Sequence, residues 1–328
     1  MCCKKLANER CAVFVRYIPL VLIVCMICLN ISIYSKLIHQ PCISGRKQVV
    51  SEKIKQLNFT YQLDPSHVCK DKQNLLVAVI TAPKNKLKRQ KWREFFQTHS
   101  KMENVTYRHV FVIGQISELD DTSQRSILAE HGKYSDILQE DFRDIYENLA
   151  IKSFAMLKWF VSNCGKVDYV LKIDDDVFLN LPGLWKAIYN ASSMANRNNQ
   201  GQNATDFVLG HYEKSHHPIR NPKSKWYVST DLYSKPRYPD YSNGAAYVIS
   251  RGAAERMYQA CRLERVIPLE DMFITGYCRD KAGVKIVFND NLCMIRELSG
   301  YIPDNCVTLH TYGKRPDSYA PRNSTTFT

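Results

Sequence analysis

The sequence predicts an α/β fold with a mostly parallel, twisted sheet flanked by helices. Continuous apolar runs of strand length occur at residues 75–80, 109–113 and 169–173, as expected for strands that are covered on both faces. Between the last two runs, apolar residues from Ala150 to Val161 recur at intervals of four, three and four. This spacing predicts an amphipathic helix that ends near Gly165. The order strand, helix, strand favours parallel pairing.

Further elements follow in the C-terminal half. Residues 245–249 form another apolar run of strand length, and residues 284–288 predict a short strand. Helices are predicted at residues 252–261 and around residues 271–281. The later part of the chain therefore continues the same α/β pattern.

The N-terminal part predicts a membrane anchor followed by a stem. Residues 17–34 form a mainly apolar stretch of 18 residues, near the shortest length that crosses a bilayer as a helix. The basic residues before it are Lys4, Lys5, Arg10 and Arg16. The positive-inside rule therefore places residues 1–16 in the cytosol, with a polar stem at 35–69 and a single domain at 70–328 in a lumen. A cleaved signal peptide is the alternative, which the length of the apolar stretch disfavours.

Glycosylation sequons and cysteines support a lumenal domain. Sequons begin at Asn58, Asn104, Asn190, Asn203 and Asn323. Seven of the twelve cysteines follow the apolar stretch, without the C-x-x-C pairs typical of zinc sites, so we expect disulfides in an oxidising compartment. Because seven is odd, either one thiol is free or Cys42 links two chains as a homodimer.

The net charge of +13 does not indicate a nucleic-acid-binding protein, because no nucleic-acid-binding motif accompanies it. Basic residues instead gather at residues 84–93, directly after the first apolar run. This segment is either a solvated loop or a contact for a nucleotide diphosphate or an anionic surface. Arg89 and Arg93 would share one face if the segment is helical.

Three consecutive carboxylates follow the apolar run at 169–173. Asp174, Asp175 and Asp176 have no basic residue among them, and oxygen ligands of this kind suit Mg²⁺ or Mn²⁺. Open α/β sheets bind ligands at the carboxyl ends of their strands. The cluster therefore predicts metal-assisted chemistry on a phosphorylated molecule, with a solvated acidic turn as the alternative. Of the three, Asp176 is the first candidate ligand.

The motifs between about residues 75 and 315 resemble, in their order, those of the β-1,3-glycosyltransferases. This family includes the β-1,3-galactosyltransferases, the β-1,3-N-acetylglucosaminyltransferases and, more distantly, the Fringe enzymes. The motifs are Arg89-x-x-x-Arg93, Asp141-Phe142-x-Asp144-x-Tyr146-x-Asn148-Leu149-x-x-Lys152, Lys172-x-Asp174-Asp175-Asp176, Lys225-Trp226-Tyr227, Gly244-x-x-Tyr247 and Glu270-Asp271. The resemblance implies a GT-A fold, a single-pass type II enzyme of the Golgi membrane, a UDP-sugar donor and Mn²⁺.

The resemblance also implies roles for individual residues. His310 would complete the metal site of Asp176 and Asp174, whereas Asp174 and Asp175 would hold ribose, water or a second coordination position. The residues expected to line the rest of the donor site are Thr81, Arg89, Arg93, Lys172 and Gly244.

A single base suffices for transfer with inversion, and the resemblance assigns that role to Asp271 with Glu270 in support. Helix capping is the other interpretation of this acidic pair. The expected reaction is transfer of galactose or an N-acetylhexosamine to a glycan hydroxyl, forming a β-1,3 linkage on a glycoprotein or glycolipid. The alternatives are a non-catalytic glycan-binding protein of the same fold and a metal-dependent phosphohydrolase.

Overall fold

The computed structural model describes residues 59–100, 105–116, 121–197, 206–213, 216–294 and 306–310. The strands are β1 (Tyr61–Leu63), β2 (Gln73–Ile80), β3 (Tyr107–Gln115), β4 (Ile137–Arg143), β5 (Val167–Asp174), β6 (Val177–Leu179), β7 (Phe207–Glu213), β8 (Tyr241–Ser250), β9 (Lys285–Phe288), β10 (Leu292–Met294) and β11 (Thr308–His310). The helices are η2 (Ser66–Cys69), α2 (Lys86–Thr98), α3 (Asp121–Tyr134), η3 (Tyr146–Asn148), α4 (Leu149–Asn163), α5 (Leu181–Arg197), α6 (Arg251–Cys261), η4 (Met272–Cys278) and α7 (Arg279–Lys281).

The main sheet is mixed, with the order β1-β4-β3-β2-β5-β8-β7-β9. The central strands β4, β3, β2 and β5 are parallel, as the apolar runs predict, and β9 is parallel to β7. Antiparallel pairing joins β1 to β4, β5 to β8 and β8 to β7. The prediction of a mostly parallel sheet is therefore right for its centre.

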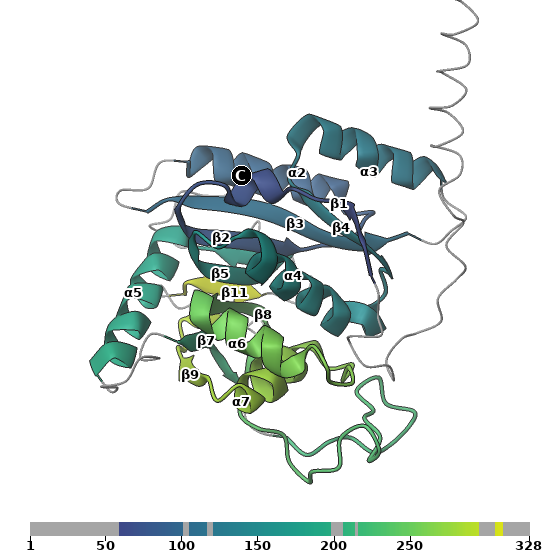
Figure 1. Ribbon diagram of the computed structural model, residues 1–328, viewed down its shortest axis with the longest axis vertical. Helices are drawn as coiled ribbons and strands as arrows, with labels where there is room; N and C mark the ends of the chain where they lie inside the picture. The colour runs from purple at the N-terminus through teal and green to yellow at the C-terminus, as the bar shows by residue number, and fades with distance from the viewer. Residues whose placement is uncertain are drawn as a thin grey trace, which may run out of the picture. The chain divides into compact units, whose positions relative to one another are not determined.

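Helices cover both faces of this sheet (Figure 1). Side chains of α2, α3 and α5 pack on one face, against strand residues such as Val77 and Ile173. Side chains of α4, α6 and η4 pack on the other, against neighbours such as Ala78 and Val170. Strands buried on both sides are the reason for the continuous apolar runs in the sequence.

A smaller sheet has the order β10-β11-β6. Strand β11 pairs antiparallel with β6, which places His310 opposite Val177. This pairing brings the C-terminal segment to the turn that follows β5.

The domain begins before the predicted stem ends at residue 69. Strand β1 pairs with β4, and Cys69 forms a disulfide with Cys164 at the end of α4. Two more disulfides join Cys261 to Cys278 and Cys293 to Cys306. The expectation of disulfides is confirmed, and the seventh cysteine of the set, Cys42, lies outside the described residues.

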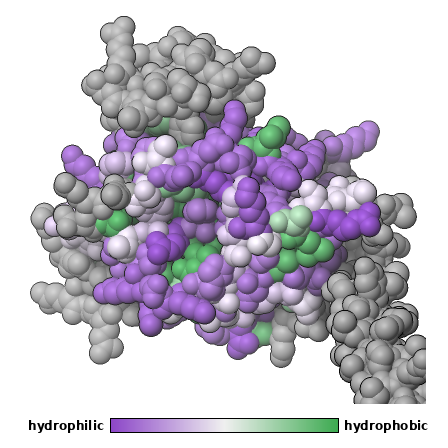
Figure 2. Space-filling model, turned by 90° about the horizontal axis from the view of Figure 1, so that it is seen from above, coloured by the Kyte–Doolittle hydropathy of each residue, from purple (hydrophilic) through white to green (hydrophobic). Residues whose placement is uncertain are grey.

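The predicted anchor at 17–34 also lies outside the described residues. Within the described ranges, no helix is both long and apolar enough to cross a membrane. The sequon residue Asn190 is exposed on α5. The surface seen from above is largely hydrophilic, with small apolar patches (Figure 2).

The structure decides two local points that the sequence left open. The basic segment is helical and not a loop, because α2 runs from Lys86 to Thr98. The predicted helix around residues 271–281 is present, but residues 272–278 form a π-helix, and α7 follows it.

Candidate active site

The acidic turn lies where the sheet topology predicts a ligand site. Asp174 is the last residue of β5 and pairs in register with Ile80, the last residue of β2. Asp175 and Asp176 form the turn into β6. The cluster therefore lies at the carboxyl edge of the two central parallel strands.

Asp175 turns toward the start of α2. Its carboxylate accepts hydrogen bonds from Thr81 Oγ1 at 2.6 Å, Asn85 Nδ2 at 2.7 Å and Lys88 Nζ at 2.6 Å. These contacts fix the turn to the segment after β2. They do not support the predicted direct contact of Asp175 with a donor.

Asp176 lies beside His310, although the two are far apart in the sequence. His310 Nε2 is 3.5 Å from Asp176 Oδ1, and the side chain of Asp176 is 39% exposed. The interaction with His310 lowers the pKa of Asp176, which keeps this carboxylate ionised. The structure thus brings together two of the three residues predicted as metal ligands, whereas Asp174, the third, is paired with Lys172.

A buried lysine connects Asp174 to the second acidic motif. Lys172 Nζ donates to Asp174 Oδ1 at 2.6 Å and to the carbonyl of Gly244, and it lies 3.7 Å from Glu270 Oε2. The hydroxyl of Tyr247 donates to Glu270 Oε1 at 2.7 Å. Burial raises the pKa of Asp174 to about 6, although Lys172 acts in the opposite direction.

The absence of a side chain at Gly244 allows Glu270 and Asp271 to pack closely against it. A Cβ atom on Gly244 would lie 2.8 Å from Glu270 Oε2 and 3.2 Å from Asp271 Cβ, and both distances are too short for an unstrained contact. The resemblance placed Gly244 in the lining of the donor site. The structure shows instead a close approach of the two carboxylate residues.

Asp271 has properties that match both interpretations left open by the sequence, helix capping and a general base. It is the N-cap of η4, and its Oδ1 accepts a hydrogen bond from the Met272 amide at 2.8 Å. Burial raises the pKa of Asp271 to about 7, and the charge of Glu270 acts in the same direction. A carboxylate that releases its proton near neutral pH suits a general base.

Arg89 is buried behind the loop after β2. Its guanidinium donates to Glu130 at 2.9 and 2.7 Å, and to the carbonyls of Ala82 and Pro83 at 2.8 and 3.2 Å. Its side chain is only 1% exposed. Arg89 therefore holds the loop in place, and its contacts do not support direct donation to a diphosphate.

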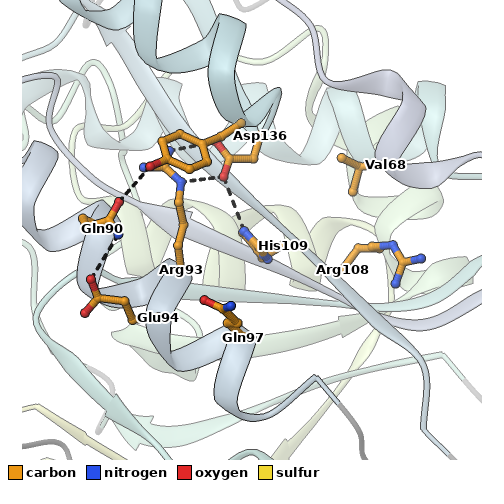
Figure 3. A pocket seen from close by; sticks show the side chains of 9 residues that line it. Val68, Gln90, Arg93, Glu94, Gln97, Arg108, His109 and Asp136 are labelled. Carbon is orange, nitrogen blue, oxygen red and sulfur yellow. Dashed lines mark hydrogen bonds and ion pairs between the residues drawn. The ribbon is translucent and has the colours of Figure 1, made fainter.

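Arg93 shares a helix face with Arg89 and also pairs with Glu130, at 2.8 Å, but it lines a pocket that Arg89 does not. Its guanidinium donates to Asp136 at 2.7 and 2.8 Å, with His109 beside the same carboxylate (Figure 3). These residues line a pocket of about 460 Å³. His109 is in register with Val77 of β2.

Along the strands of the sheet, the position of His109 lies well before the acidic turn. Val77 is in register with Leu171, three residues before Asp174. Three residues of a strand span about 10 Å. The predicted nucleotide contact of Arg93 is therefore not supported by its position.

Asp144 and Lys152, which belong to one of the sequence motifs, form a polar network that the sequence analysis did not predict. Lys152 Nζ donates to Asp144 Oδ1 at 2.7 Å and to the Thr81 carbonyl at 2.8 Å, and Asp144 Oδ2 accepts from the Gly114 amide at 2.7 Å. The network joins the ends of β2 and β3 to α4. The fixed spacing of Asp144 and Lys152 within one motif was its signal in the sequence.

Asp176 and His310, at the carboxyl edge of the central strands, suit a metal ion that is also bound by a substrate. Within the part of the chain that the structure describes, no three His, Cys, Asp or Glu side chains form a complete metal-binding group. Asp176 and His310 offer one oxygen and one nitrogen, a set that suits Mn²⁺ if phosphate oxygens and water supply the other ligands. The two side chains therefore fit the implied ion.

Comparison with known proteins identifies the family. Residues 87–290 match the family described as Galactosyltransferase. The chain belongs to this family. The similarity to β-1,3-glycosyltransferases found in the motifs is thereby confirmed.

Individual relatives have related names. The protein is 32% identical over 234 residues to lactosylceramide 1,3-N-acetyl-beta-D-glucosaminyltransferase A of Danio rerio, covering 69% of this chain and 59% of that protein. It is 29% identical over 228 residues to beta-1,3-galactosyltransferase 2 of Homo sapiens, covering 69% and 52%. The chain thus spans somewhat more than half the length of these curated relatives.

Similarity to solved structures is distant. A crystal structure of the galactosyltransferase LgtC with donor and acceptor sugar analogues shares 13% identity at a TM-score of 0.35, covering 73% of this chain and 87% of that one. A likeness at this level adds nothing to the functional argument.

Proposed function

We propose that this protein is a GT-A glycosyltransferase that transfers galactose or an N-acetylhexosamine from a UDP-sugar to a glycan hydroxyl, with inversion and dependence on Mn²⁺. One observation carries the proposal. The turn with Asp176 and His310 is joined through Asp174 and Lys172 to the acidic pair Glu270 and Asp271 at one edge of the sheet. A metal-binding pair beside a base is the arrangement that such a transfer needs.

The donor end of the site is assigned to the acidic turn. Asp176 and His310 would hold Mn²⁺, with Asp174 as the further predicted ligand. The ion supplies positive charge that offsets the charge developing on the leaving diphosphate. Asp175, Thr81 and Arg89 act indirectly, by holding the turn and the loop after β2.

The acceptor end is assigned to Asp271. Its carboxylate takes the proton of the acceptor hydroxyl as that oxygen attacks the anomeric carbon from the face opposite the diphosphate. Glu270 is less suited to this step, because Tyr247 and Lys172 already contact its two oxygens. Glu270 instead helps to fix the position of Lys172 and hence of Asp174.

The β-1,3 linkage is supported by the names of the two relatives. We further propose that the chain is a single-pass type II protein of the Golgi membrane and acts on glycoproteins or glycolipids in the lumen. The disulfides favour such an oxidising compartment. Unchanged electrophoretic mobility after glycosidase treatment, with the C-terminus accessible from the cytosol, would contradict this topology.

A donor and acceptor panel tests the activity. The purified full-length protein is incubated with UDP-galactose, UDP-N-acetylglucosamine or UDP-N-acetylgalactosamine, with Mn²⁺ or EDTA, and with β-galactoside and β-N-acetylglucosaminide acceptors. We expect a β-1,3-linked product, identified by NMR, that depends on Mn²⁺. Saccharide binding without transfer from any donor would favour the non-catalytic glycan-binding protein. Release of phosphate from the nucleotide without sugar transfer would favour the phosphohydrolase.

A further inference from the structure

Two exposed aromatic side chains lie side by side near the proposed base. Tyr146, the first residue of η3, is 56% exposed, and Trp226 is 47% exposed. The ammonium group of Lys225 lies 6.0 Å from the ring centre of Tyr146 and 4.5 Å from that of Trp226. Contiguous exposed apolar surface of this kind is typical of a binding site.

The loop that carries Trp226 is fixed to the segment that follows the base. Arg220 Nη1 donates to the Val228 carbonyl at 2.7 Å and so closes the loop on itself. Arg279 Nη2, just after η4, donates to the Asp240 carbonyl at 2.9 Å. The end of the loop is therefore held against the start of α7, and the ring of Tyr233, within the loop, lies 6.3 Å from that of Tyr277 on η4.

Tyr146 comes from a different segment, the turn that follows β4. The side chain of Asn148 donates to the Arg143 carbonyl at 2.9 Å, which fixes the turn that carries Tyr146. Partial burial and the negative charge of Asp271 raise the pKa of the Tyr146 phenol.

We propose that Tyr146 and Trp226 form the acceptor platform, on which a pyranose ring of the glycan stacks with its reactive hydroxyl toward Asp271. This inference rests on the proposed function and extends it to the acceptor. An aromatic ring offers a flat apolar face with a polar edge, which matches the C–H face and hydroxyl rim of a pyranose. Lys225 supplies a donor for hydroxyl oxygens at the same place.

The acceptor platform is tested by measuring the kinetics of variants at these two exposed residues. We expect Trp226→Ala and Tyr146→Ala each to raise the acceptor KM about tenfold, a size typical of the loss of one stacked aromatic contact. The KM for the UDP-sugar and the affinity for UDP with Mn²⁺ should stay within about twofold. Trp226→Phe, which keeps an aromatic face, should restore most of the acceptor affinity. Tyr189→Ala removes a 65% exposed tyrosine on α5 and serves as the matched control with normal kinetics.

Two kinetic results would overturn the platform. An unchanged acceptor KM in both alanine variants would show that the rings do not contact the acceptor. A loss of UDP affinity equal to the loss of acceptor affinity would place the rings at the nucleotide instead.

A binding measurement separates this inference from the proposed function. With Mn²⁺ and UDP present, methyl β-galactoside or methyl β-N-acetylglucosaminide should change the tryptophan emission of the wild type. Most of this change should be absent in Trp226→Phe, since Trp92 and Trp159 are buried and Trp185 is partly buried on α5, where its ring packs against Tyr169. If no donor gives transfer, the proposed function fails, whereas the emission difference would still support a sugar site. Identical responses of wild type and Trp226→Phe would reject the platform, whatever the transfer assay shows.

Discussion

His310 Nε2 lies 3.5 Å from Asp176 Oδ1, because strand β11 pairs antiparallel with β6 directly after the acidic turn. The contact joins a residue near the C-terminal end of the described chain to the carboxyl edge of the central sheet. It places an exposed carboxylate beside the histidine that the proposed metal site requires. The metal prediction below depends on this pair.

Asp176→Asn should weaken Mn²⁺-dependent UDP binding, because it removes the charge at almost constant shape. Loss of one charged ligand should reduce the affinity at least about tenfold. Calorimetric titration of UDP with and without Mn²⁺ measures it. Asp280→Asn, which changes a side chain that is 54% exposed, is the control. Metal-dependent binding of normal strength in Asp176→Asn would move the ligand role elsewhere.

Lys172→Met should destabilise the fold, because it leaves Asp174 and Glu270 without their buried cation. Removal of one partner from a buried ion pair typically costs 3–5 kcal/mol, and we expect about 3 kcal/mol here because the Asp174 side chain is 35% exposed. Urea unfolding measures the loss of free energy. Lys281→Met breaks the more exposed pair with Glu264 and should cost less than about 1 kcal/mol. Equal costs for both variants would show that the buried position of Lys172 has no special importance.

Gly244→Ala should reduce transfer strongly, because its new Cβ atom would displace Glu270 and Asp271. Misplacement of a catalytic group by about 1 Å can reduce the rate about 10²-fold. The control is Gly165→Ala, whose Cβ would meet nothing within 4 Å. Transfer rates and thermal unfolding of both variants decide, and normal activity in Gly244→Ala would show that the acidic pair tolerates displacement.

The pKa of Asp271, raised to about 7, predicts a pH dependence of both activity and stability. The base acts when deprotonated, so kcat/KM should fall about tenfold for each pH unit below about 7. In the unfolded chain an Asp releases its proton near pH 4. The folded state thus holds a proton that the unfolded state has lost between about pH 4 and 7, and the contribution of Asp271 to stability falls as pH rises through this window.

Asp271→Asn removes this penalty and retains a good N-cap. We therefore expect the stability of the variant, relative to wild type, to increase between pH 5 and 8 by about 2–3 kcal/mol. Thermal unfolding across this range measures the difference. A constant difference would show that the Asp271 carboxyl titrates at its ordinary pKa.

The sequence predicts the centre of the fold well, because β2, β3 and β5 are buried on both faces and appear as continuous apolar runs. It also predicts the proximity of Asp176 and His310, although through resemblance alone, since their contact depends on long-range strand pairing. The roles of Arg89 and Arg93 could not be predicted. Their carboxylate partners, Glu130 and Asp136, lie about forty residues away in sequence.

Local spacing also fails to predict the π-helix that follows Asp271. Its backbone differs from an α-helix by the hydrogen-bond partner of each amide, and such turns are often found at functional sites. Likewise, the tight approach of Gly244 to Glu270 arises from packing between β8 and η4. Neither feature leaves a periodic signal in the sequence.

The most direct test of the proposed mechanism compares Asp271→Asn with Asp176→Asn in one set of purified proteins. UDP-sugar affinity in the presence of Mn²⁺ and the rate of transfer are measured on each. The account predicts that Asp271→Asn binds the UDP-sugar normally and loses about 10² to 10⁴-fold in transfer, as expected for loss of a general base. Asp176→Asn should lose donor binding itself. Near-normal turnover in a folded Asp271→Asn protein would contradict the account and make Glu270 the next candidate for the base.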